Sequence, residues 1–437
     1  MAKFCVLVVY NLILPFFFIF AFPAWLIKMG KRGGFGTGLL ERFSIFKEDK
    51  YSEKQGVVYI HAVSVGEVLV AIKLIKEWLV QHPNEQILLV PTTSTGHEVA
   101  KEYAPEGVRV IYSPLDFSFI LKRVFKRFSP KQIILMESEI WPNMLYVAEK
   151  LSIPVHIANA RLSPRSEKRY LKLGKILRPL LGMLDQLCVQ DEGDKSRWSA
   201  VGVPSEKITV TGSVKFDQSG GAKPQRRSEF REILENAFPE RNKIVMAIST
   251  HAGEEAWIAD SLLSLKENVN LVIVPRHAER RKEVRSDVEE LGYTVVMRSQ
   301  NQSEQKHENS TKPEIKVCLI VDSTGELRDW TAHADLVIVG KSILGKGGQN
   351  PTEAMAASVP VLCGPYMRNF EPLITQIKEV GGLIEFSSNR ELADAVKGFL
   401  EDTSGSKEKQ AASALKVLES HQGATLKTVK VLSDVAR

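Results

Sequence analysis

The chain has 437 residues, enough for two or three domains of ordinary size. Its composition, 44% hydrophobic and 25% charged with 29 Gly and 20 Pro, excludes disordered, collagen-like and multi-span membrane proteins. Four cysteines (Cys5, Cys188, Cys318 and Cys363) lie far apart with no CxxC pair, so neither a disulfide framework nor a zinc ribbon is expected. The net charge of +6 is mild, but the basic residues are clustered.

The N-terminal segment is strongly apolar. No charged residue occurs between Phe4 and Ile27, a stretch long enough to cross a bilayer. Its length, its bulky Phe residues and the basic cluster that follows at once argue against a cleaved signal peptide. Residues 1–28 are therefore predicted to be a retained membrane anchor, and the heavier positive charge after them places the rest of the chain on the cytoplasmic side. A monotopic segment lying in the membrane plane is the alternative.

Two basic runs follow, at 122–131 and 161–178. In the second, Lys and Arg alternate with Leu, Ile and Tyr, which predicts a basic amphipathic helix from Ser166 to Arg178. Such a helix either presents an ordinary solvated face or meets anionic lipid headgroups or a phosphorylated lipid substrate. No RNA-binding motif accompanies the charge, so a nucleic-acid partner is not expected.

Short β-branched runs alternate with helical patterns, which predicts an α/β protein. The runs are 57–60, 87–90, 108–111, 133–136, 155–158 and 187–189, then 244–248, 271–274, 317–321, 336–339 and 359–362. The interruption at 218–242, which begins with Gly, Pro and charged residues, is interpreted as an interdomain linker. We expect two doubly wound, Rossmann-like domains, 29–217 and 243–437, that face a cleft and bind ligands at the carboxyl ends of their strands. Residues 298–312 are polar and are expected to form a loose surface loop.

The first predicted strand leads into a motif that ends in an acid. His61-Ala-Val-Ser-Val-Gly-Glu67 is followed by a helical pattern over 68–80, so Glu67 is expected at a strand-to-helix turn facing the cleft. A carboxylate there can act as a general base. The alternative is that a Glu in the first turn of a helix only complements the helix dipole.

Further polar motifs follow other strands of the same half. Glu137-Ser-Glu139-Ile-Trp-Pro142-Asn comes after 133–136, and Pro142 is expected to begin a helix. Glu137 and Glu139 either bind a metal as an acidic pair or pair with a basic, substrate-positioning side chain, and no His or further Asp lies near them to complete a metal site. The other motifs in this half are Asn159-Ala-Arg161-Leu-Ser163 and Thr211-Gly-Ser-Val-Lys215-Phe-Asp217.

The second half has the pattern of a nucleotide site. The segment 249–255 (STHAGEE) opens a helix after a strand and offers free backbone N–H groups to an anion. Arg276 follows the next strand, where its guanidinium can fork onto a phosphate. A glycine-rich loop from Gly340 leads to Asn350 as the expected helix N-cap and Pro351 as the first helical residue. Glu353 either accepts hydrogen bonds from ribose hydroxyls or compensates the helix dipole.

Taken in order, the motifs resemble one family: the Kdo (3-deoxy-D-manno-octulosonic acid) transferases of lipopolysaccharide synthesis, glycosyltransferases of the GT-B fold. The motifs are HAVSVGE, ESEIWPN, NARLS, GSVKFD, STHAGEE, VPRHAER, GGQNPTEA and GPYMRNF, and the resemblance runs from the anchor to about residue 385. It implies an inverting transfer of one or more Kdo residues from CMP-Kdo to a hydroxyl of a lipid A precursor. The catalytic domains would lie on the cytoplasmic face of the inner membrane.

The resemblance also implies roles for single residues. Glu67 would be the general base, with Glu137 and Lys215 stabilising the transition state. Contacts to CMP would come from Pro275, Arg276, Gly325, Glu326, Leu327, Asn350, Pro351, Thr352 and Glu353. No metal or other cofactor is expected, because a CMP leaving group carries one phosphate whose charge cationic side chains and helix N-termini can offset.

The sequence departs from the family pattern at three positions: Lys341 stands where Gly is usual, Gln349 where His is frequent, and Ala252 where Glu is common. Two other functions stay open beside the family one. The first is a GT-B transferase that uses a UDP-sugar on a membrane lipid. The second is a non-catalytic, membrane-tethered protein that binds a nucleotide sugar.

Overall fold

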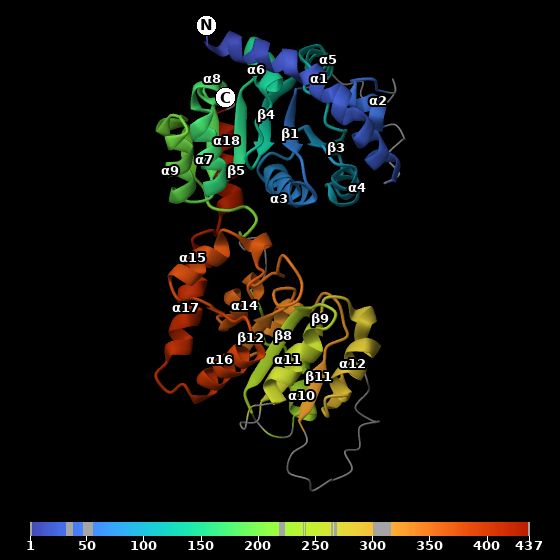
Figure 1. Ribbon diagram of the computed structural model, residues 1–437, viewed down its shortest axis with the longest axis vertical. Coiled ribbons are helices and arrows are strands. Elements are labelled where there is room, and N and C mark those ends of the chain that lie inside the picture. Colours follow the sequence, from blue (N-terminus) through green and yellow to red (C-terminus); the bar gives the residue numbers. More distant parts are fainter. Residues whose placement is uncertain are drawn as a thin grey trace. The chain divides into compact units, whose positions relative to one another are not determined.

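The computed structural model describes residues 2–31, 38–46, 56–217, 223–238, 240, 242–263, 265, 269–299 and 316–435. The chain forms two compact units, which are Met1–Gln218 with His421–Arg437, and Ser219–Ser420 (Figure 1). The expected end of the first domain at 217 lies beside the break between the units. Residues 421–437, expected in the second domain, belong to the first unit instead.

The first unit is built on a seven-stranded parallel sheet with the strand order β3-β2-β1-β4-β5-β6-β7. The strands are β1 (Val57–Ala62), β2 (Ile87–Pro91), β3 (Arg109–Val110), β4 (Pro130–Met136), β5 (Val155–Ala160), β6 (Gln186–Val189) and β7 (Ile208–Val210). The central strands are buried along their length, as their apolar runs require in a sheet covered on both faces. Strand order reverses between β1 and β4, so their carboxyl ends form the topological switch point where such sheets bind ligands.

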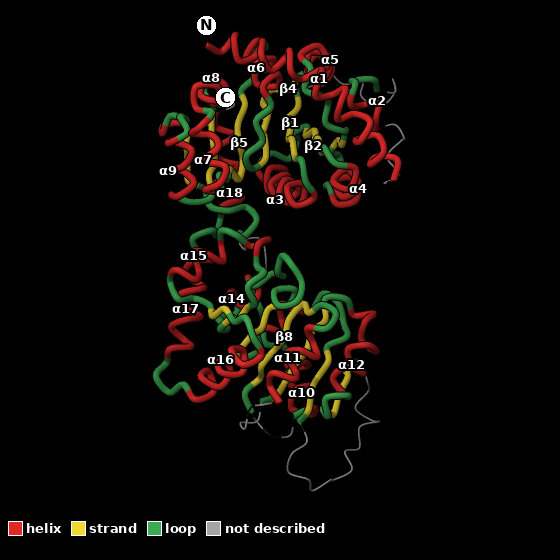
Figure 2. Tube along the Cα trace, in the orientation of Figure 1, coloured by secondary structure: helices red, strands yellow, loops and turns green. Residues whose placement is uncertain are grey.

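Helices cover both faces of this sheet, as Figure 2 shows with strands in yellow between red helices. On one face α3 (Val65–Gln81) and α18 (Ala424–Val435) pack on Val58 and Ile60 of β1. On the other face α5 (Ser118–Phe128) and α6 (Pro142–Lys150) pack on Tyr59 and on Ile133 of β4. The remaining helices of the unit are α1 (Ala2–Lys31), α2 (Gly38–Arg42), α4 (Ser94–Tyr103), α7 (Pro164–Lys172), α8 (Gly174–Leu181) and α9 (Glu192–Ala200).

The second unit repeats the plan with a parallel sheet of order β10-β11-β9-β8-β12-β13-β14. Its strands are β8 (Ile244–Thr250), β9 (Asn270–Pro275), β10 (Thr294–Met297), β11 (Val317–Ile320), β12 (Leu336–Val339), β13 (Val361–Cys363) and β14 (Ile384–Glu385). Its helices are α10 (Ser228–Ala237), α11 (Glu254–Leu263), α12 (Arg281–Glu289), α13 (Leu327–Thr331), α14 (Thr352–Ala356), α15 (Leu373–Glu379), α16 (Asn389–Glu401) and α17 (Ser406–Glu419). The switch point of this sheet lies between β8 and β12.

Helix α18 follows the second unit in sequence but packs in the core of the first, against α3 (Figure 1, red). Its N-terminus is held by the buried carboxylate of Asp217, which accepts hydrogen bonds from Gly423 N at 3.0 Å and Thr425 N at 2.8 Å. The Thr425 hydroxyl donates to the same carboxylate at 2.6 Å. The first unit is therefore completed by residues more than 200 positions further along the chain, as the 206- and 208-residue separations of these bonds show.

Two expectations for local structure are corrected. The linker expected at 218–242 contains helix α10, whose Phe230 stacks on Trp330 of the second unit with ring centroids 4.2 Å apart. The single basic helix expected from Ser166 to Arg178 is two helices, α7 and α8, which meet at Leu173 and Gly174. Glycine has low helix propensity, which favours a break at this point. The expected surface loop lies largely outside the described residues, since 300–315 are not described.

Helix α1 lies against the first unit, beside α6 and α8 (Figure 1). Leu7 is buried, the Tyr10 hydroxyl donates to Asp116 at 2.9 Å, and Asn11 exchanges amide hydrogen bonds with Asn143 at 2.9 and 2.8 Å. Among the described residues, no helix combines the length and apolarity needed to cross a membrane. The spanning anchor expected at 1–28 is therefore not supported.

Candidate active site

Glu67 closes the turn between β1 and α3. Its buried carboxylate accepts hydrogen bonds from Val63 N at 2.9 Å, from the Ser64 hydroxyl at 2.8 Å and from Ser64 N at 3.3 Å, while the Ser64 hydroxyl accepts from Glu67 N. This is a complete capping box at the start of α3. The expected position in the first turn of the helix is confirmed, and the carboxylate also has a structural role there.

Two more carboxylates and two cations lie close to Glu67 at the same sheet edge. Burial, followed by the negative charge of Glu67, raises the pKa of Glu137, whereas Arg161 and Lys215 oppose that rise. Burial and then Glu67 also raise the pKa of Glu139, to about 7. Partial desolvation lowers the pKa of Lys215, opposed by the neighbouring Glu137. The switch point of the first unit thus gathers three acids and two bases, and the pKa values of Glu137, Glu139 and Lys215 are shifted there, as is common at functional sites.

The loop that carries Lys215 is fixed from three sides. Val214 N donates to the buried Asn159 side chain at 3.0 Å, and Lys73 of α3 donates to Val214 O at 2.9 Å and also to Asp217 O. Ser213 N donates to His421 Nδ1 at 3.1 Å, just before α18. These contacts hold the backbone on both sides of Lys215, so its position depends on β5, α3 and the C-terminal segment together.

The strand ends at both switch points have strained backbone. Glu137 follows β4 at φ 58° and Asn159 lies in β5 at φ 53°, while in the second unit Ser249 lies in β8 at φ 51° and Lys341 follows β12 at φ 54°. Asparagine tolerates a left-handed φ, but for Glu137, Ser249 and Lys341 it costs of the order of 1 kcal/mol or more. Such strain is characteristic of active sites and ligand-binding turns.

A buried acid organises the switch point of the second unit. Glu254, with none of its surface exposed, accepts hydrogen bonds from the backbone N–H groups of His251, Lys341, Ile343 and Leu344 at 3.0, 2.6, 3.1 and 3.3 Å. It therefore joins the start of α11 to the glycine-rich loop after β12. The expectation that the segment 249–255 offers its N–H groups freely to an anion is corrected at His251, whose N–H is bound by Glu254.

The glycine at the start of this loop is required by close packing. A Cβ atom on Gly340 would lie 2.5 Å from Ser249 O and 2.6 Å from Thr250 Cα, too close for any side chain. Gly340 N in turn donates to Ile248 O at 2.8 Å. The loop therefore begins directly against the carboxyl end of β8.

The expected nucleotide-binding residues lie at neighbouring strand ends of the second unit. Arg276 follows β9 with its side chain exposed, and Glu353 lies in the first turn of α14. Burial raises the pKa of Glu353, opposed by Arg328 and Arg276, and its Oε2 atom is buried with no hydrogen-bond partner among the described residues. A buried carboxylate oxygen of this kind is suited to a hydroxyl donor from a ligand.

The other members of the expected set have structural contacts. Helix α14 begins at Thr352, one residue later than expected, with Pro351 at the cap; Asn350 Oδ1 accepts from Thr352 N at 3.1 Å and from its hydroxyl at 2.9 Å. Glu326 accepts from Ser323 and, at 2.9 Å, from Arg298. Gly325 has φ +83° just before α13, which begins at Leu327, and Pro275 is the last residue of β9.

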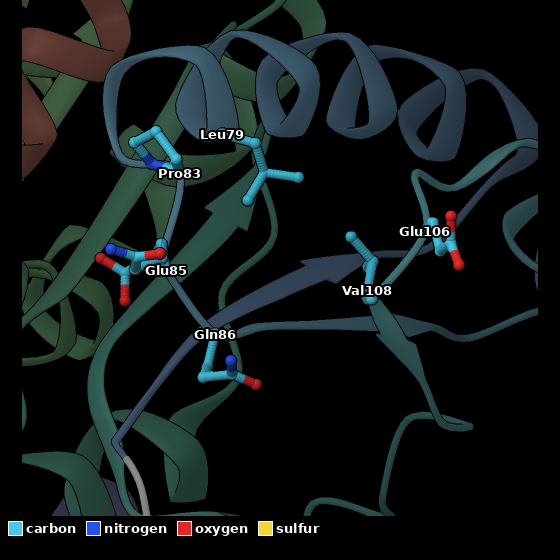
Figure 3. Close-up of a pocket in the computed structure, with 8 residues that line it drawn as sticks. Leu79, Pro83, Glu85, Gln86, Glu106 and Val108 are labelled. Carbon is cyan, nitrogen blue, oxygen red and sulfur yellow. The ribbon is translucent and has the colours of Figure 1, made fainter.

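One open pocket of about 470 Å³ lies elsewhere in the first unit. It is lined by Leu79, Pro83, Asn84, Glu85, Gln86, Glu106, Gly107 and Val108, which precede β2 and β3 or end α3 (Figure 3). This is the amino edge of the sheet, opposite the carboxyl ends where the acids and bases gather. Over the described part of the chain, no three His, Cys, Asp or Glu side chains lie close enough together to hold a metal ion.

The structure therefore brings Glu67, Glu137 and Lys215 together in the first unit, and Arg276 and Glu353 together in the second. Sequence reasoning counted Arg161 in the basic run 161–178 but gave it no catalytic role, and it gave no role to Glu254. Arg161 belongs to the motif 159–163, which the sequence analysis singled out. Its place at the end of a strand, two residues after Asn159, is the signal that could have identified it as a site residue. The role of Glu254 depends on contacts with residues 87 to 90 positions away, which no local pattern shows.

Solved structures share this architecture. A glycosyltransferase from Rickettsia africae ESF-5 superposes with a TM-score of 0.51 over 88% of this chain and 98% of its own, at 13% identity, which shows a common fold of two parallel-sheet α/β units like those of GT-B glycosyltransferases. The C-terminal CMP-Kdo binding domain of WaaA from Acinetobacter baumannii is 29% identical over 44% of this chain and 97% of its own, with a TM-score of 0.38.

Sequence comparison gives the family. The model of the 3-deoxy-D-manno-octulosonic-acid transferase (kdotransferase) family matches residues 37–218. A 3-deoxy-D-manno-octulosonic acid transferase from Haemophilus influenzae is 32% identical over 397 residues, 90% of each chain. The chain belongs to the Kdo transferase family and is a glycosyltransferase, related to the enzymes of lipopolysaccharide synthesis.

The raised pKa of Glu139 generates a stability prediction. In the folded state its carboxyl keeps a proton up to about pH 7, whereas in the unfolded chain it releases the proton near pH 4.3. The folded state therefore binds more protons between these values, so stability attributable to Glu139 falls as pH rises through about 5 to 7. We expect the melting temperature of Glu139→Gln, relative to the parent, to increase from pH 5 to pH 8 and then level off.

The control is Glu106→Gln, which changes an exposed Glu far from this cluster. Its melting temperature should differ from that of the parent by the same amount at every pH. A Glu139→Gln curve parallel to that of the parent would show that the buried carboxyl titrates normally.

Proposed function

We propose that this chain transfers Kdo from CMP-Kdo to a hydroxyl of a lipid A precursor, with inversion, in a single displacement. The observation that carries the proposal is the division of chemistry between two switch points. The first unit holds acids with a lysine and an arginine, suited to activating a hydroxyl, and the second holds an arginine and a buried, unpartnered carboxylate oxygen, suited to a nucleotide. The names of the Kdo transferases and of the CMP-Kdo binding domain to which the chain is similar agree with this assignment.

In this proposal Glu67 is the general base that removes the proton from the acceptor hydroxyl. Its neighbours Glu137 and Glu139 lie at the same edge, and the negative charge of Glu67 contributes to the raised pKa of both. Lys215, with Arg161 beside it, contributes positive charge that stabilises the transition state. Glu137 stabilises the transition state by holding Lys215 in place through their opposite charges.

The donor half of the proposal places the CMP moiety on the second unit. Arg276 pairs with the phosphate, and the free oxygen of Glu353 accepts a hydrogen bond from a ribose hydroxyl. The backbone around Pro275, from Gly325 to Leu327 and from Asn350 to Thr352 completes the nucleotide contacts. A UDP-sugar transferase would need the same ribose contact but a second phosphate site, and a binding protein would have no use for the acids of the first unit.

Glu67→Gln tests the base. Gln keeps one oxygen, which can accept from Ser64 N and so preserve the capping box, but it loses the second oxygen, which accepts from Val63 N in the parent. The amide cannot take a proton. Turnover should fall by about two to four decades, the usual contribution of general base catalysis, with unchanged CMP affinity and a melting temperature lowered only by the loss of one hydrogen bond. Glu77→Gln, on the same helix, is the matched control and should be as active as the parent. Turnover of Glu67→Gln within about threefold of the parent would reject the assignment.

Arg276→Ala and Glu353→Ala test the nucleotide site. A charge-assisted contact to a phosphate contributes about 1.5 to 3 kcal/mol, so calorimetry should show CMP binding weakened roughly 10- to 150-fold in Arg276→Ala. Glu353→Ala should weaken both CMP and cytidine, because its partner is the ribose. The control is Arg281→Ala, an exposed arginine five residues away. Unchanged CMP affinity in both variants would place the nucleotide elsewhere.

We further propose that the transfer needs no metal, because cations of the protein can offset the charge of a single phosphate. Activity should therefore survive prolonged dialysis against EDTA, measured as CMP release from CMP-Kdo in the presence of acceptor. Loss of activity that Mg²⁺ restores would contradict this and would make Glu137 and Glu139 candidate ligands.

We also propose that the enzyme works on the cytoplasmic face of the inner membrane, with α1 lying in the membrane plane. The face of α1 that carries Leu7 and Tyr10 packs on the protein, which leaves apolar side chains outside, with Phe20 79% exposed. The other exposed large side chains of α1 are Phe4, Val8, Val9, Leu12, Ile13, Phe16 and Ile19. A helix with one face on the protein and the other apolar and exposed is suited to an interface. Basic residues of α7 and α8 add attraction to anionic lipids.

Two sets of substitutions separate the contributions to membrane binding. Replacing Phe4, Leu12, Phe16 and Ile19 by Ser should reduce binding to anionic vesicles at every salt concentration. Replacing Lys168, Arg169, Lys172 and Lys175 by Gln should remove only the salt-sensitive part, worth roughly 1 kcal/mol per basic residue, and raise the KM for the lipid acceptor. The control is Arg281→Gln with Lys282→Gln, two exposed residues of α12. If the serine variant floats with vesicles like the parent, α1 does not bind the membrane.

A further inference from the structure

Lys341 is an unusual residue for its position. It directly follows Gly340 after β12 and holds φ +54°, a conformation that glycine adopts without strain and a long side chain does not. Its backbone is fixed on both sides, because Lys341 N donates to Glu254 at 2.6 Å and Lys341 O accepts from Gly348 N at 3.0 Å. The strain is therefore maintained by the buried Glu254 and by the glycine-rich loop.

The side chain of Lys341 is half-buried. Its stem lies along Gly345, where an added Cβ would come within 3.0 Å of Lys341 Cγ. Among the described residues no carboxylate forms an ion pair with its ammonium. A lysine that is partly desolvated and lacks an acidic partner leaves a positive charge available to a ligand.

The surroundings of Lys341 show where that charge is directed. Burial, and then the positive charge of Lys341, lower the pKa of His251. The His251 ring lies 2.9 Å from Gln349 Nε2 and edge-to-face with His277 at 5.9 Å between centroids. The ammonium is therefore near the ends of β8 and β12, at the switch point of the second unit, and Arg276 at the end of β9 also lacks an ion-pair partner among the described residues.

We propose that Lys341 is a donor-binding residue whose ammonium, together with Arg276, receives an anionic group of the donor. This inference rests on the proposed function, since CMP-Kdo carries two such groups, the phosphate and the carboxylate of the sugar. It adds Lys341 to the residues 350–353 that are expected to contact CMP. The strained φ is retained because it places the positive charge at the switch point.

Binding of cytidine and CMP by calorimetry, and the KM for CMP-Kdo, test the proposal. Lys341→Asn tolerates the left-handed φ but carries no charge. It should bind CMP about tenfold more weakly and cytidine as tightly as the parent, whereas Lys341→Arg should stay within about threefold of the parent for both. Lys341→Gly should lose CMP affinity like Lys341→Asn while its melting temperature equals or exceeds that of the parent.

The sugar carboxylate is the partner if CMP affinity is unchanged in Lys341→Asn but the KM for CMP-Kdo rises about tenfold. Lys346→Asn, which changes an exposed lysine of the same loop, is the matched control. The proposal is overturned if CMP affinity and donor KM are both unchanged in Lys341→Asn, or if Lys346→Asn causes an equal loss. Failure of the parent itself to bind CMP would instead reject the proposed function, and this inference with it.

Discussion

The burial of both faces of each sheet is the constraint on which the rest of this structure depends. Strands such as β1 and β5 are covered by helices on either side and have no exposed surface at which a polar group can work. Chemistry is therefore confined to the strand ends, and the reversal of strand order opens a space at only one place in each sheet. Glu67 and Glu137 lie beside that place in one unit, and Glu254 and Lys341 lie beside it in the other. Each sheet therefore offers one place at which polar side chains can meet a ligand.

The two switch points use acids in different ways. In the second unit Glu254 is buried completely and satisfied by four backbone donors, so it acts as an internal tie between two loops. In the first unit the acids are crowded instead. Burial and mutual repulsion raise the pKa of Glu137 and Glu139, and Arg161 and Lys215 limit the rise for Glu137. A carboxylate satisfied by backbone donors stabilises a fold, whereas burial and neighbouring charge shift the pKa of a crowded one, as is common where protons are exchanged.

Sequence reasoning located the central strands and the site because both leave local signals. A buried parallel strand is a continuous apolar run, and Pro142 and Glu67 mark helix starts by the chemistry of the first turn. The strands that were missed, β7, β10 and β14, all lie at sheet edges, where short strands need fewer apolar residues. Helix α10 was not predicted, because the polar stretch that precedes it is typical of a linker. Its Phe230 stacks on Trp330 in the second unit. Hydrogen bonds between residues far apart in the sequence, such as those from Leu344 N to Glu254 and from Thr425 N to Asp217, produce no pattern in the local sequence.

The return of α18 to the first unit has a consequence for how the protein is made. On the ribosome, residues 1–218 emerge long before α18, and the whole second unit is synthesised between them. Until His421 and Thr425 arrive, the Lys215 loop lacks two of its hydrogen-bonded supports and the face of the sheet beneath α3 lacks Val429 and Leu432. The second unit, continuous in sequence, can fold as soon as it is complete, whereas the first must wait with apolar surface uncovered. Assembly of the first unit is thereby the last folding step, so that a chain interrupted in synthesis would hold a folded second unit attached to an unfinished first one.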